Sequence, residues 1–108
     1  MQAPPDELLR AWRPIYEQFL SRVRDGAASV PKVVASSWWR SRSRNATVGG
    51  ALYSQHLLGF ALDLVTPTPR ALVVALVSQG LHAIDEGDHV HVQAFPPGAL
   101  PRSLFESV

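Results

Sequence analysis

Two short stretches of the sequence contain side chains that can bind a metal ion. The first holds His56, followed seven residues later by Asp63, and the second holds Asp88, His89 and His91. The chain contains no cysteine, so a metal site would have to use imidazole nitrogens and carboxylate oxygens. Catalytic zinc takes three protein ligands of this kind and keeps another position open for water. His56, Asp63 and His91 form such a set.

The chemistry of this set would be hydrolysis. Zinc lowers the pKa of its bound water and polarises a carbonyl group, and a neighbouring carboxylate can pass the proton of that water to the leaving amine. Asp88 is the first candidate for this base, and Glu86 is the second. Because side chains alternate along a strand, Asp88 can face the same side as His91 only from a turn or a bulge.

Each of these residues also has a purely structural interpretation. A histidine shortly before Gly59 can simply shape a loop, and Asp63 can be a buried carboxylate that is hydrogen-bonded. His89 can be a surface residue, a partner of a metal ligand or a substitute ligand, and His82 is more typical of a structural residue. The spacing alone leaves these alternatives open.

The surrounding sequence predicts a mixture of helices and short strands. Asp63 alternates with Leu62 and Leu64, which is the period of a strand, so it points away from the side of its apolar neighbours. Gly59 lets the chain turn sharply before this strand. The expected order is a helix from the acidic pair after Pro5 to a stop at Gly26, a strand at 30–35, a loop at 36–53, a strand at 60–65, a helix at 70–79 after an N-cap at Thr68, strands at 81–84 and 89–94 joined by a hairpin turn at 85–88, and an irregular tail from Pro96.

The composition is typical of a globular chain, with a hydrophobic fraction of 46% and a charged fraction of 18%. The length of 108 residues predicts one domain, residues 1–108, with the motif-bearing core at about 30–95. The net charge of +1 points to neither nucleic acid nor a membrane as the partner. Six basic residues lie between Arg22 and Arg44, which fits either an ordinary solvated surface or attraction to an anionic polymer such as cell wall.

The combined pattern resembles a known family, the zinc D-Ala-D-Ala carboxypeptidases. That family includes phage L-alanyl-D-glutamate endolysins of peptidoglycan and shares its fold with the Hedgehog signalling domain. The resemblance runs from about Val30 to Ala94 and includes the stretch Asn-Ala-Thr-Val-Gly-Gly at 45–50. The family motif Ser-x-His-x-x-Gly-x-Ala-x-Asp is matched at Ser54, His56, Gly59, Ala61 and Asp63. The closing motif, an acidic residue three positions before a histidine, is matched by Asp88 and His91.

The resemblance implies an α+β fold in which a small, mainly antiparallel sheet is flanked by helices, with zinc at one edge. It implies that zinc is the cofactor, that His56, Asp63 and His91 bind it, and that Asp88 is the general base.

Two further site residues follow from the same resemblance. Arg40 matches the family arginine that holds the substrate and the developing oxyanion, with Arg42 and Arg44 as weaker candidates. Ser54 matches a serine near the substrate, although it could equally cap the loop. The chain departs from the family at Ser37-Trp38-Trp39, where a glycine and an aromatic residue normally precede the arginine, and at Phe60. Both departures would alter the pocket.

The implied function is zinc-dependent hydrolysis of peptide bonds in peptidoglycan stem peptides. An aspartate at position 88 favours the endolysins that cut L-Ala–D-Glu, with D-Ala-D-Ala carboxypeptidase as the alternative. The main rival is a non-catalytic, zinc-containing module that binds cell wall or a partner protein, and nucleic-acid binding through the three arginines is a third interpretation. Residues 1–7 lack the basic start and apolar run of a signal peptide, which fits a phage or prophage protein that acts on the cell wall. The longest apolar run, at 71–77, is too short to cross a membrane, and the oligomeric state stays open.

Overall fold

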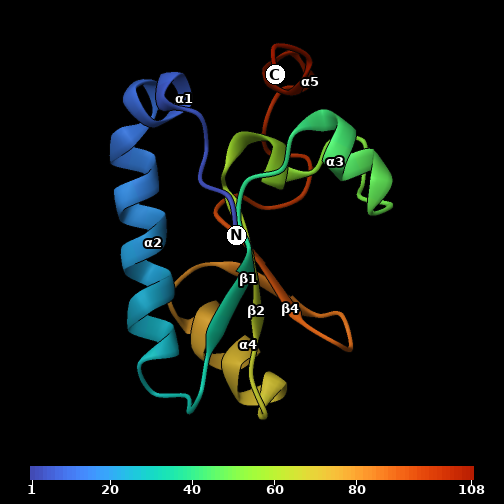
Figure 1. Ribbon diagram of the computed structural model, residues 1–108. Coiled ribbons are helices and arrows are strands. Elements are labelled where there is room, and N and C mark those ends of the chain that lie inside the picture. Colours follow the sequence, from blue (N-terminus) through green and yellow to red (C-terminus); the bar gives the residue numbers. More distant parts are fainter.

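The computed structural model describes all 108 residues and has the α+β fold that the sequence predicts. Its centre is a four-stranded antiparallel sheet with the strand order β1-β2-β4-β3 (Figure 1). The strands are β1 (Val34–Ser37), β2 (Ala61–Val65), β3 (His82–Asp85) and β4 (Val90–Gln93). The two central strands, β2 and β4, are therefore paired on both sides.

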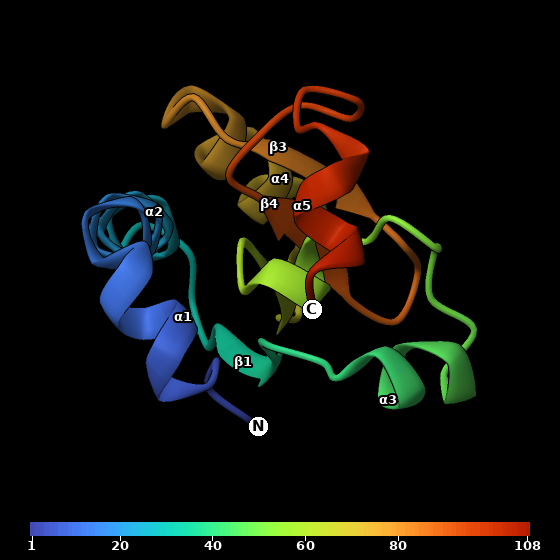
Figure 2. The same ribbon diagram turned by 90° about the horizontal axis from the view of Figure 1, so that it is seen from above.

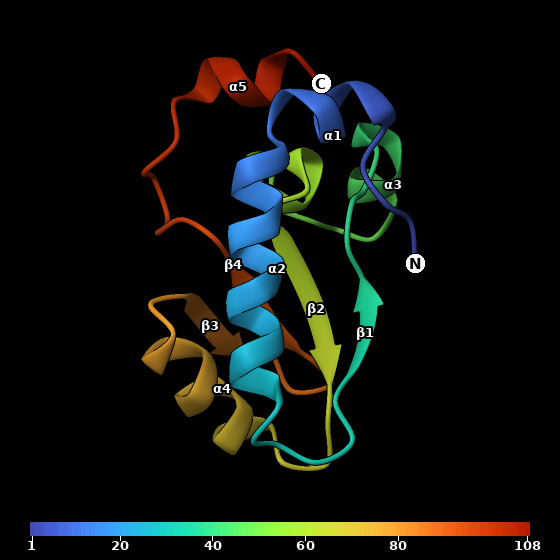
Figure 3. The ribbon, with the colours of Figure 1, turned by 90° about the vertical axis from the view of Figure 1, so that its left-hand side faces the viewer.

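Helices cover one face of this sheet and leave the other face open. The two longest, α2 and α4, pack against each other across the covered face, as Figure 3 shows. The shorter helices gather near one end of the sheet (Figures 1 and 3). The helices are α1 (Asp6–Ala11), α2 (Arg13–Ala27), α3 (Arg42–Thr47), the single 3₁₀ turn η1 (Gln55–Leu58), α4 (Pro69–Ser78) and α5 (Arg102–Glu106).

The main hydrophobic core lies between the covered face and the two long helices. Alternation along the strands turns the apolar side chains of β2 and β4 toward this side. The strand contribution is Leu62, Leu64, Val90 and Val92, and the helix contribution is Phe19 and Val23 from α2 with Leu72 and Leu76 from α4. Burial of this surface fixes which residues of β2 and β4 must face the open side.

A second hydrophobic cluster joins the C-terminal segment to the rest of the molecule. Its buried members are Tyr16, Leu57, Leu58, Phe60 and Phe105. The rings of Tyr16 and Phe60 lie 5.3 Å apart between their centroids. Phe105 places α5 against η1, and Figure 2 shows these two helices one above the other. The segment after Pro97 is therefore a packed part of this fold.

The N-terminal helix differs from the sequence prediction. The expected single helix is divided into α1 and α2, with the break at Trp12. Pro14 explains the break, because proline has no N–H to donate to the carbonyl of Arg10 and its ring would collide with that carbonyl. Pro14 lies in the first turn of α2 instead, where a missing N–H costs nothing.

Strand and loop boundaries also differ. The strand predicted at 30–35 begins only at Val34, because the chain turns at Pro31 and Lys32, and Lys32 has a left-handed φ of 55°. The loop expected at 36–53 contains α3, which starts where the Oγ of Ser41 accepts the N–H of Arg44 at 3.1 Å. Only one residue of α3 is buried, so no apolar period marks this helix in the sequence. The tail predicted to be irregular contains α5, whose five residues are too few for a helical period.

The other predicted elements are confirmed. α4 begins at Pro69, directly after the N-cap position at Thr68, and Gly80, with a φ of 79°, follows its end. A turn joins β3 and β4 in the predicted place, and Gly59 turns the chain before β2 with a φ of 77°. None of the helices is long and apolar enough to span a membrane.

Candidate metal centre

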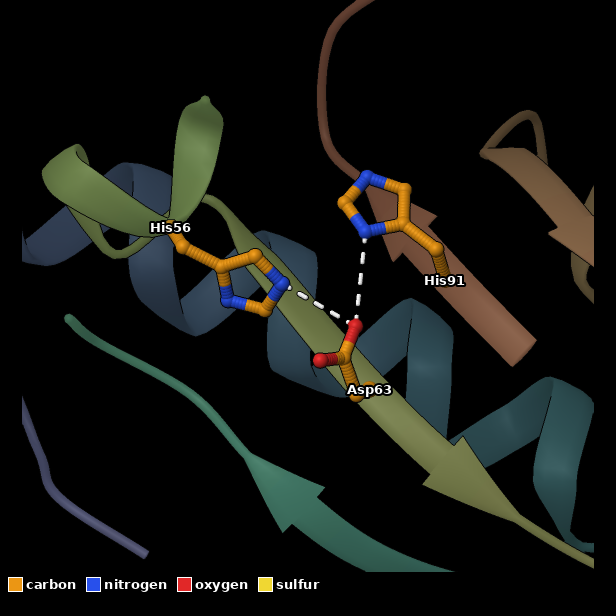
Figure 4. A group of neighbouring side chains, drawn as sticks. All are labelled: His56, Asp63 and His91. Carbon is orange, nitrogen blue, oxygen red and sulfur yellow. Dashed lines mark hydrogen bonds and ion pairs between the residues drawn. The ribbon is translucent and has the colours of Figure 1, made fainter. Parts of the chain in front are cut away.

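His56, Asp63 and His91 come together on the open face of the sheet, from three separate elements (Figure 4). Asp63 and His91 are direct partners in the β2–β4 register, so their side chains lie on the same face. His56 projects toward them from η1 (Figure 4). The cluster therefore lies over the two central strands, and the expectation of a site at one edge of the sheet is wrong.

The distances within this cluster suit a single small cation. The Nε2 of His56 lies 3.0 Å and the Nδ1 of His91 lies 3.4 Å from the same oxygen, Oδ1 of Asp63. One ligand atom from each residue lies within 4.8 Å of the others. A tetrahedral zinc ion, with bonds of about 2.0–2.1 Å, holds its ligand atoms about 3.4 Å apart. Small rotations of the imidazole rings would therefore bring all three atoms to ligating distance.

The outer nitrogen of each imidazole has a hydrogen-bond partner of its own. The Nδ1 of His56 donates to the main-chain carbonyl of Trp38 at 2.5 Å, and the Nε2 of His91 donates to the Oε1 of Gln93 at 2.8 Å. The amide of Gln93 is held in that orientation because its Nε2 donates to the carbonyl of Phe95. The inner nitrogen of each imidazole faces Asp63, and it can contact the carboxylate only when it carries a proton or when a cation lies between them. Metal-binding histidines are oriented in the same way by a second hydrogen bond.

Asp63 divides its two oxygens between different partners. Its Oδ2 accepts a hydrogen bond from the Nη2 of Arg40 at 2.5 Å, and its Oδ1 faces the two histidines. Burial alone would raise the pKa of Asp63, but hydrogen bonds to His56 and His91 and the charges of His56 and Arg40 outweigh it, so the pKa lies well below the usual range. The carboxylate is therefore ionised at any physiological pH, as a metal ligand must be.

The pKa of His91 is shifted in the opposite direction to that of Asp63. Burial lowers the pKa of His91, but hydrogen bonds to Asp63 and Gln93, together with the charges of Asp63 and Glu86, raise it overall. In the metal-free protein the raised pKa favours a proton on His91, at the place that a cation would occupy beside Asp63. A bound cation would compete with that proton.

The turn that carries His56 is fixed at both ends. At its start the Oγ of Ser54 accepts the N–H of His56 at 3.2 Å, which is the capping role considered for this serine. At its end Gly59 has a left-handed conformation, and a Cβ there would lie 2.6 Å from the Cγ of Pro4. Only glycine therefore fits this position.

Aromatic side chains satisfy the carbonyls at the end of this turn. The hydroxyl of Tyr16 donates to Leu58 at 2.7 Å, and the indoles of Trp38 and Trp39 donate to Gly59 at 2.8 Å and to Leu57 at 2.9 Å. The two tryptophans at the departure from the family pattern thus hold the turn of His56 and do not line the cleft. The burial of Tyr16 raises its pKa to about 12, which keeps its hydroxyl proton available as a donor.

Gln55 connects the turn of His56 to the end of β4. Its Nε2 donates to the carbonyl of Phe95 at 2.7 Å, and its Oε1 accepts the N–H of Phe95 at 3.2 Å. Both bonds go to one residue, which lies just beyond the strand that carries His91. The side chain of Gln55 therefore keeps the two histidine-bearing segments at a fixed separation.

The predicted base, Asp88, lies in the turn between β3 and β4, as its role requires. Its side chain is 90% exposed, and its Oδ1 accepts a hydrogen bond from the Nδ1 of His89 at 2.5 Å. Asp88 does not line the cleft around the candidate metal ligands, whereas Glu86 and His89 do. The Nε2 of His89 lies 3.7 Å from Asp63. The role of Asp88 as the base stays a prediction, and Glu86 is the carboxylate on the cleft wall.

A cleft of about 880 Å³ surrounds the cluster. Such a volume is typical of sites that hold small ligands and short peptides. The side chains of Arg40 and Ser54 line it, together with the three candidate metal ligands. The remaining walls come from the β3–β4 hairpin, from the loop that precedes η1 and from the C-terminal segment. The residues that the resemblance implies therefore lie in one cavity, apart from Asp88.

The three arginines near the site have different surroundings. Arg40 is bound to Asp63, and Arg42 donates to the carbonyls of Phe105 and Val108. Only Arg44 has an exposed guanidinium without a partner. Of the three arginines, only Arg40 pairs with a candidate metal ligand.

The residues that orient the histidines were not predicted from the sequence. Gln93 lies two residues after His91, on the same face of β4, and this spacing was the available signal. Nothing in the sequence indicated that the carbonyl of Trp38 binds His56, because a main-chain group carries no residue-type signal.

Comparison with known proteins supports the resemblance noted in the motifs. The family model described as Peptidase M15 matches residues 9–93, a range that contains all three candidate ligands. Neither a search of curated proteins nor a search of solved structures found a match. Because the family model matches most of the length of the chain, the chain belongs to the peptidase M15 family.

Proposed function

We propose that this protein is a zinc-dependent peptidase that hydrolyses peptide bonds in bacterial peptidoglycan stem peptides. The single observation that carries the proposal is the convergence of His56, Asp63 and His91, with both outer imidazole nitrogens already hydrogen-bonded elsewhere. The family match supports a peptidase. The donor set of two imidazoles and one carboxylate is that of catalytic zinc sites, which keep one position open.

Zinc in this site would supply an activated water and a Lewis acid for the scissile carbonyl. The residues of the chain have complementary tasks. Arg40 binds Oδ2 of Asp63 and so leaves Oδ1 as the ligand atom, a supporting bond of the kind that ligating carboxylates need. Arg40 also lines the cleft, where the rest of its guanidinium would stabilise a developing oxyanion.

The proton acceptor is one of two carboxylates in the β3–β4 turn. Asp88 has the position that the family motif assigns, and Glu86 lines the cleft. A base must come within hydrogen-bond reach of the proton that it accepts, although such contacts often form only when substrate binds. The exposed hairpin around Gly87, whose φ is 96°, is where such an adjustment would occur.

The exposure of Asp88 also favours a second candidate function, a non-catalytic module that binds zinc and cell-wall peptide. In that case neither carboxylate would matter for the site. The two functions are distinguished by Asp88→Asn and Glu86→Gln, because only a peptidase needs a base.

Which bond is cut, and where the protein acts, are further parts of the proposal. The aspartate at position 88 supports cleavage of L-Ala–D-Glu, as in the endolysins that the sequence resembles, and D-Ala-D-Ala carboxypeptidase is the alternative. An endolysin-like enzyme encoded by a phage or prophage would act on the cell wall. Identification of the fragments released from purified peptidoglycan by mass spectrometry would decide between the two bonds.

The decisive experiment is zymography on peptidoglycan with zinc-loaded protein. We expect lysis to stop with a chelator, to return with zinc and to fall at least about 100-fold in the variant that lacks the base. Asp6→Asn is the matched control, because Asp6 is an exposed carboxylate on α1. If both Asp88→Asn and Glu86→Gln keep full lysis and bound zinc, neither carboxylate is the base. If zinc-loaded wild-type protein releases no fragment, the non-catalytic function is the correct one.

A further inference from the structure

One wall of the cleft lies outside the range that the family model matches. The match ends at residue 93, whereas Pro97, Leu100, Arg102 and Phe105 line the same cleft as the candidate metal ligands. Figure 2 shows α5, which carries two of these residues, above η1. The C-terminal segment thus adds a surface of its own to the candidate active site.

Arg102 is the arginine of the cleft that is free to bind a ligand. Two arginines and no lysine line the cavity. Arg40 is held by the carboxylate of Asp63 at 2.5 Å. The side chain of Arg102 forms no ion pair and no hydrogen bond within the chain, and its one specific contact is the ring of Tyr53. All its N–H groups are therefore available.

The guanidinium of Arg102 is nevertheless held in position. Its Cζ lies 4.9 Å from the centroid of the Tyr53 ring, a cation–π contact. The ring of Tyr53 packs against Phe105 with the centroids 5.7 Å apart, and Phe105 is only 4% exposed. Arg42 fixes the backbone at this point by donating to the carbonyl of Phe105. These contacts form a chain from α3 to the cleft that orients the face of the guanidinium.

The charges along the cleft indicate what this group binds. A planar guanidinium with free N–H groups matches a carboxylate through two parallel hydrogen bonds. Elsewhere on the cleft lining, Glu86 is exposed and has no partner, so an anionic ligand is repelled there and attracted to Arg102. The ligand of the cleft is a peptide if the proposed function holds, and such a peptide can carry a free carboxylate on a residue next to the cleaved bond.

We propose that Arg102, stacked on Tyr53, is a specificity subsite that binds a free carboxylate of the peptide substrate. This inference rests on the proposed function and adds to it a preference for acidic over amidated peptides. Arg102 does not touch the reacting atoms in this assignment. It would stabilise the bound substrate and the transition state equally, and so change KM and not kcat.

The test uses the zinc-loaded full chain and the stem pentapeptide L-Ala-γ-D-Glu-L-Lys-D-Ala-D-Ala, which contains both candidate bonds, in three forms: unmodified, amidated at the α-carboxylate of glutamate, and amidated at the C-terminus. For wild-type protein we expect one amidation to raise KM about tenfold, which identifies the carboxylate that is bound. Arg102→Gln should raise KM for the unmodified peptide by the same factor, leave kcat unchanged and abolish the difference between acid and amide. Arg102→Lys should lose part of the preference, because it keeps the charge without the planar group.

The matched control is Arg10→Gln, an exposed arginine on α1 that lies outside the cleft, and it should keep wild-type KM values for all three peptides. The proposal is overturned if the ratio of KM for the amidated peptide to KM for the unmodified peptide is the same in wild-type protein and in Arg102→Gln. If wild-type protein cleaves none of the peptides, the proposed function fails. The subsite is then tested by the Kd values of the three peptides, measured by NMR titration of both proteins: an equal ratio of amide to acid Kd in the two proteins overturns it.

Discussion

The two faces of the sheet use the same strands in opposite ways. On the covered face, Leu62, Leu64, Val90 and Val92 are each at most 5% exposed and pack against α2 and α4. On the open face, Asp63 and His91 alternate with them and meet His56, Arg40 and solvent. Neighbours in the sequence thus belong to the core and to the site in turn. The apolar half of each strand holds in place the backbone from which the charged half projects.

The comparison explains how a buried carboxylate is tolerated. Isolated burial of an ionised group in a protein interior is highly unfavourable unless the group is paired and hydrogen-bonded. Asp63 is 5% exposed, as deeply buried as the leucines beside it, but each of its oxygens has charged or hydrogen-bonding partners. The covered face therefore stabilises the fold through burial of apolar side chains. The open face does so only as long as the carboxylate of Asp63 keeps its charged and hydrogen-bonding partners.

The largest effect should come from removal of the charge on the open face. We expect Asp63→Asn to weaken zinc binding by more than about 100-fold, because loss of a ligand exceeds the 10–100-fold cost of losing a supporting hydrogen bond. Zinc titration of the folded variant, monitored by competition with a chromogenic chelator, measures this. Asp6→Asn, which removes an exposed carboxylate on α1, should bind zinc like the wild type. Wild-type affinity in Asp63→Asn would exclude this residue as a ligand.

A change on the covered face should affect the fold and spare the site. Leu72 is fully buried on α4, and we expect Leu72→Ala to lower the free energy of unfolding by about 3 kcal/mol, as measured by urea denaturation. Val74→Ala is the matched control, because Val74 is 64% exposed on the same helix and its loss should cost less than about 0.5 kcal/mol. The folded fraction of Leu72→Ala should bind zinc normally. A loss of zinc affinity as large as that of Asp63→Asn would show that the two faces do not act independently.

The smallest effect should be a pH dependence that belongs to the open face alone. The raised pKa of His91 contributes stability to the metal-free protein below about pH 6.5, which is lost as the pH rises through its folded value. The lowered pKa of Asp63 contributes stability above about pH 3.9, which is lost as the pH falls through its folded value.

Metal-free protein should therefore be most stable between about pH 4 and 6.5, and thermal unfolding in the presence of a chelator measures this. The penalty of Leu72→Ala should be constant across that range, because every buried residue of the core around Leu72 is apolar and none of them titrates. An increase in the stability of metal-free protein from pH 6.5 to 8 would contradict the sign assigned to His91.

Motifs and alternation were sufficient to predict the fold class, the strand that holds Asp63 and the direction of its side chain, away from its apolar neighbours. The same rules could not predict α3, because it has a cap at Ser41 but no apolar face. Nor could they separate α1 from α2, because Leu8, Trp12 and Ile15 keep a helical period through the break. Local patterns report which residues face the core, and they do not report where a chain bends.

The supporting contacts of the site were beyond the sequence for a different reason. The carbonyls that accept from His56, Tyr16 and Trp39 belong to the main chain, which is the same at every position. The position of Arg102 depends on contacts between residues that are far apart in the chain, such as Arg42 and Phe105. Both kinds of contact are products of tertiary packing.

The double hydrogen bond from Gln55 to Phe95 makes one cooperative unit of two segments that are separated in the chain. Local fraying of η1 would break both bonds at once and release the end of β4, so the two histidine-bearing segments should open together in native-state hydrogen exchange. Zinc bound across them would slow the exchange of amides on both segments by the same factor. A site built from segments that are far apart in the sequence would thereby open and close as one unit, as a site on a single continuous segment does.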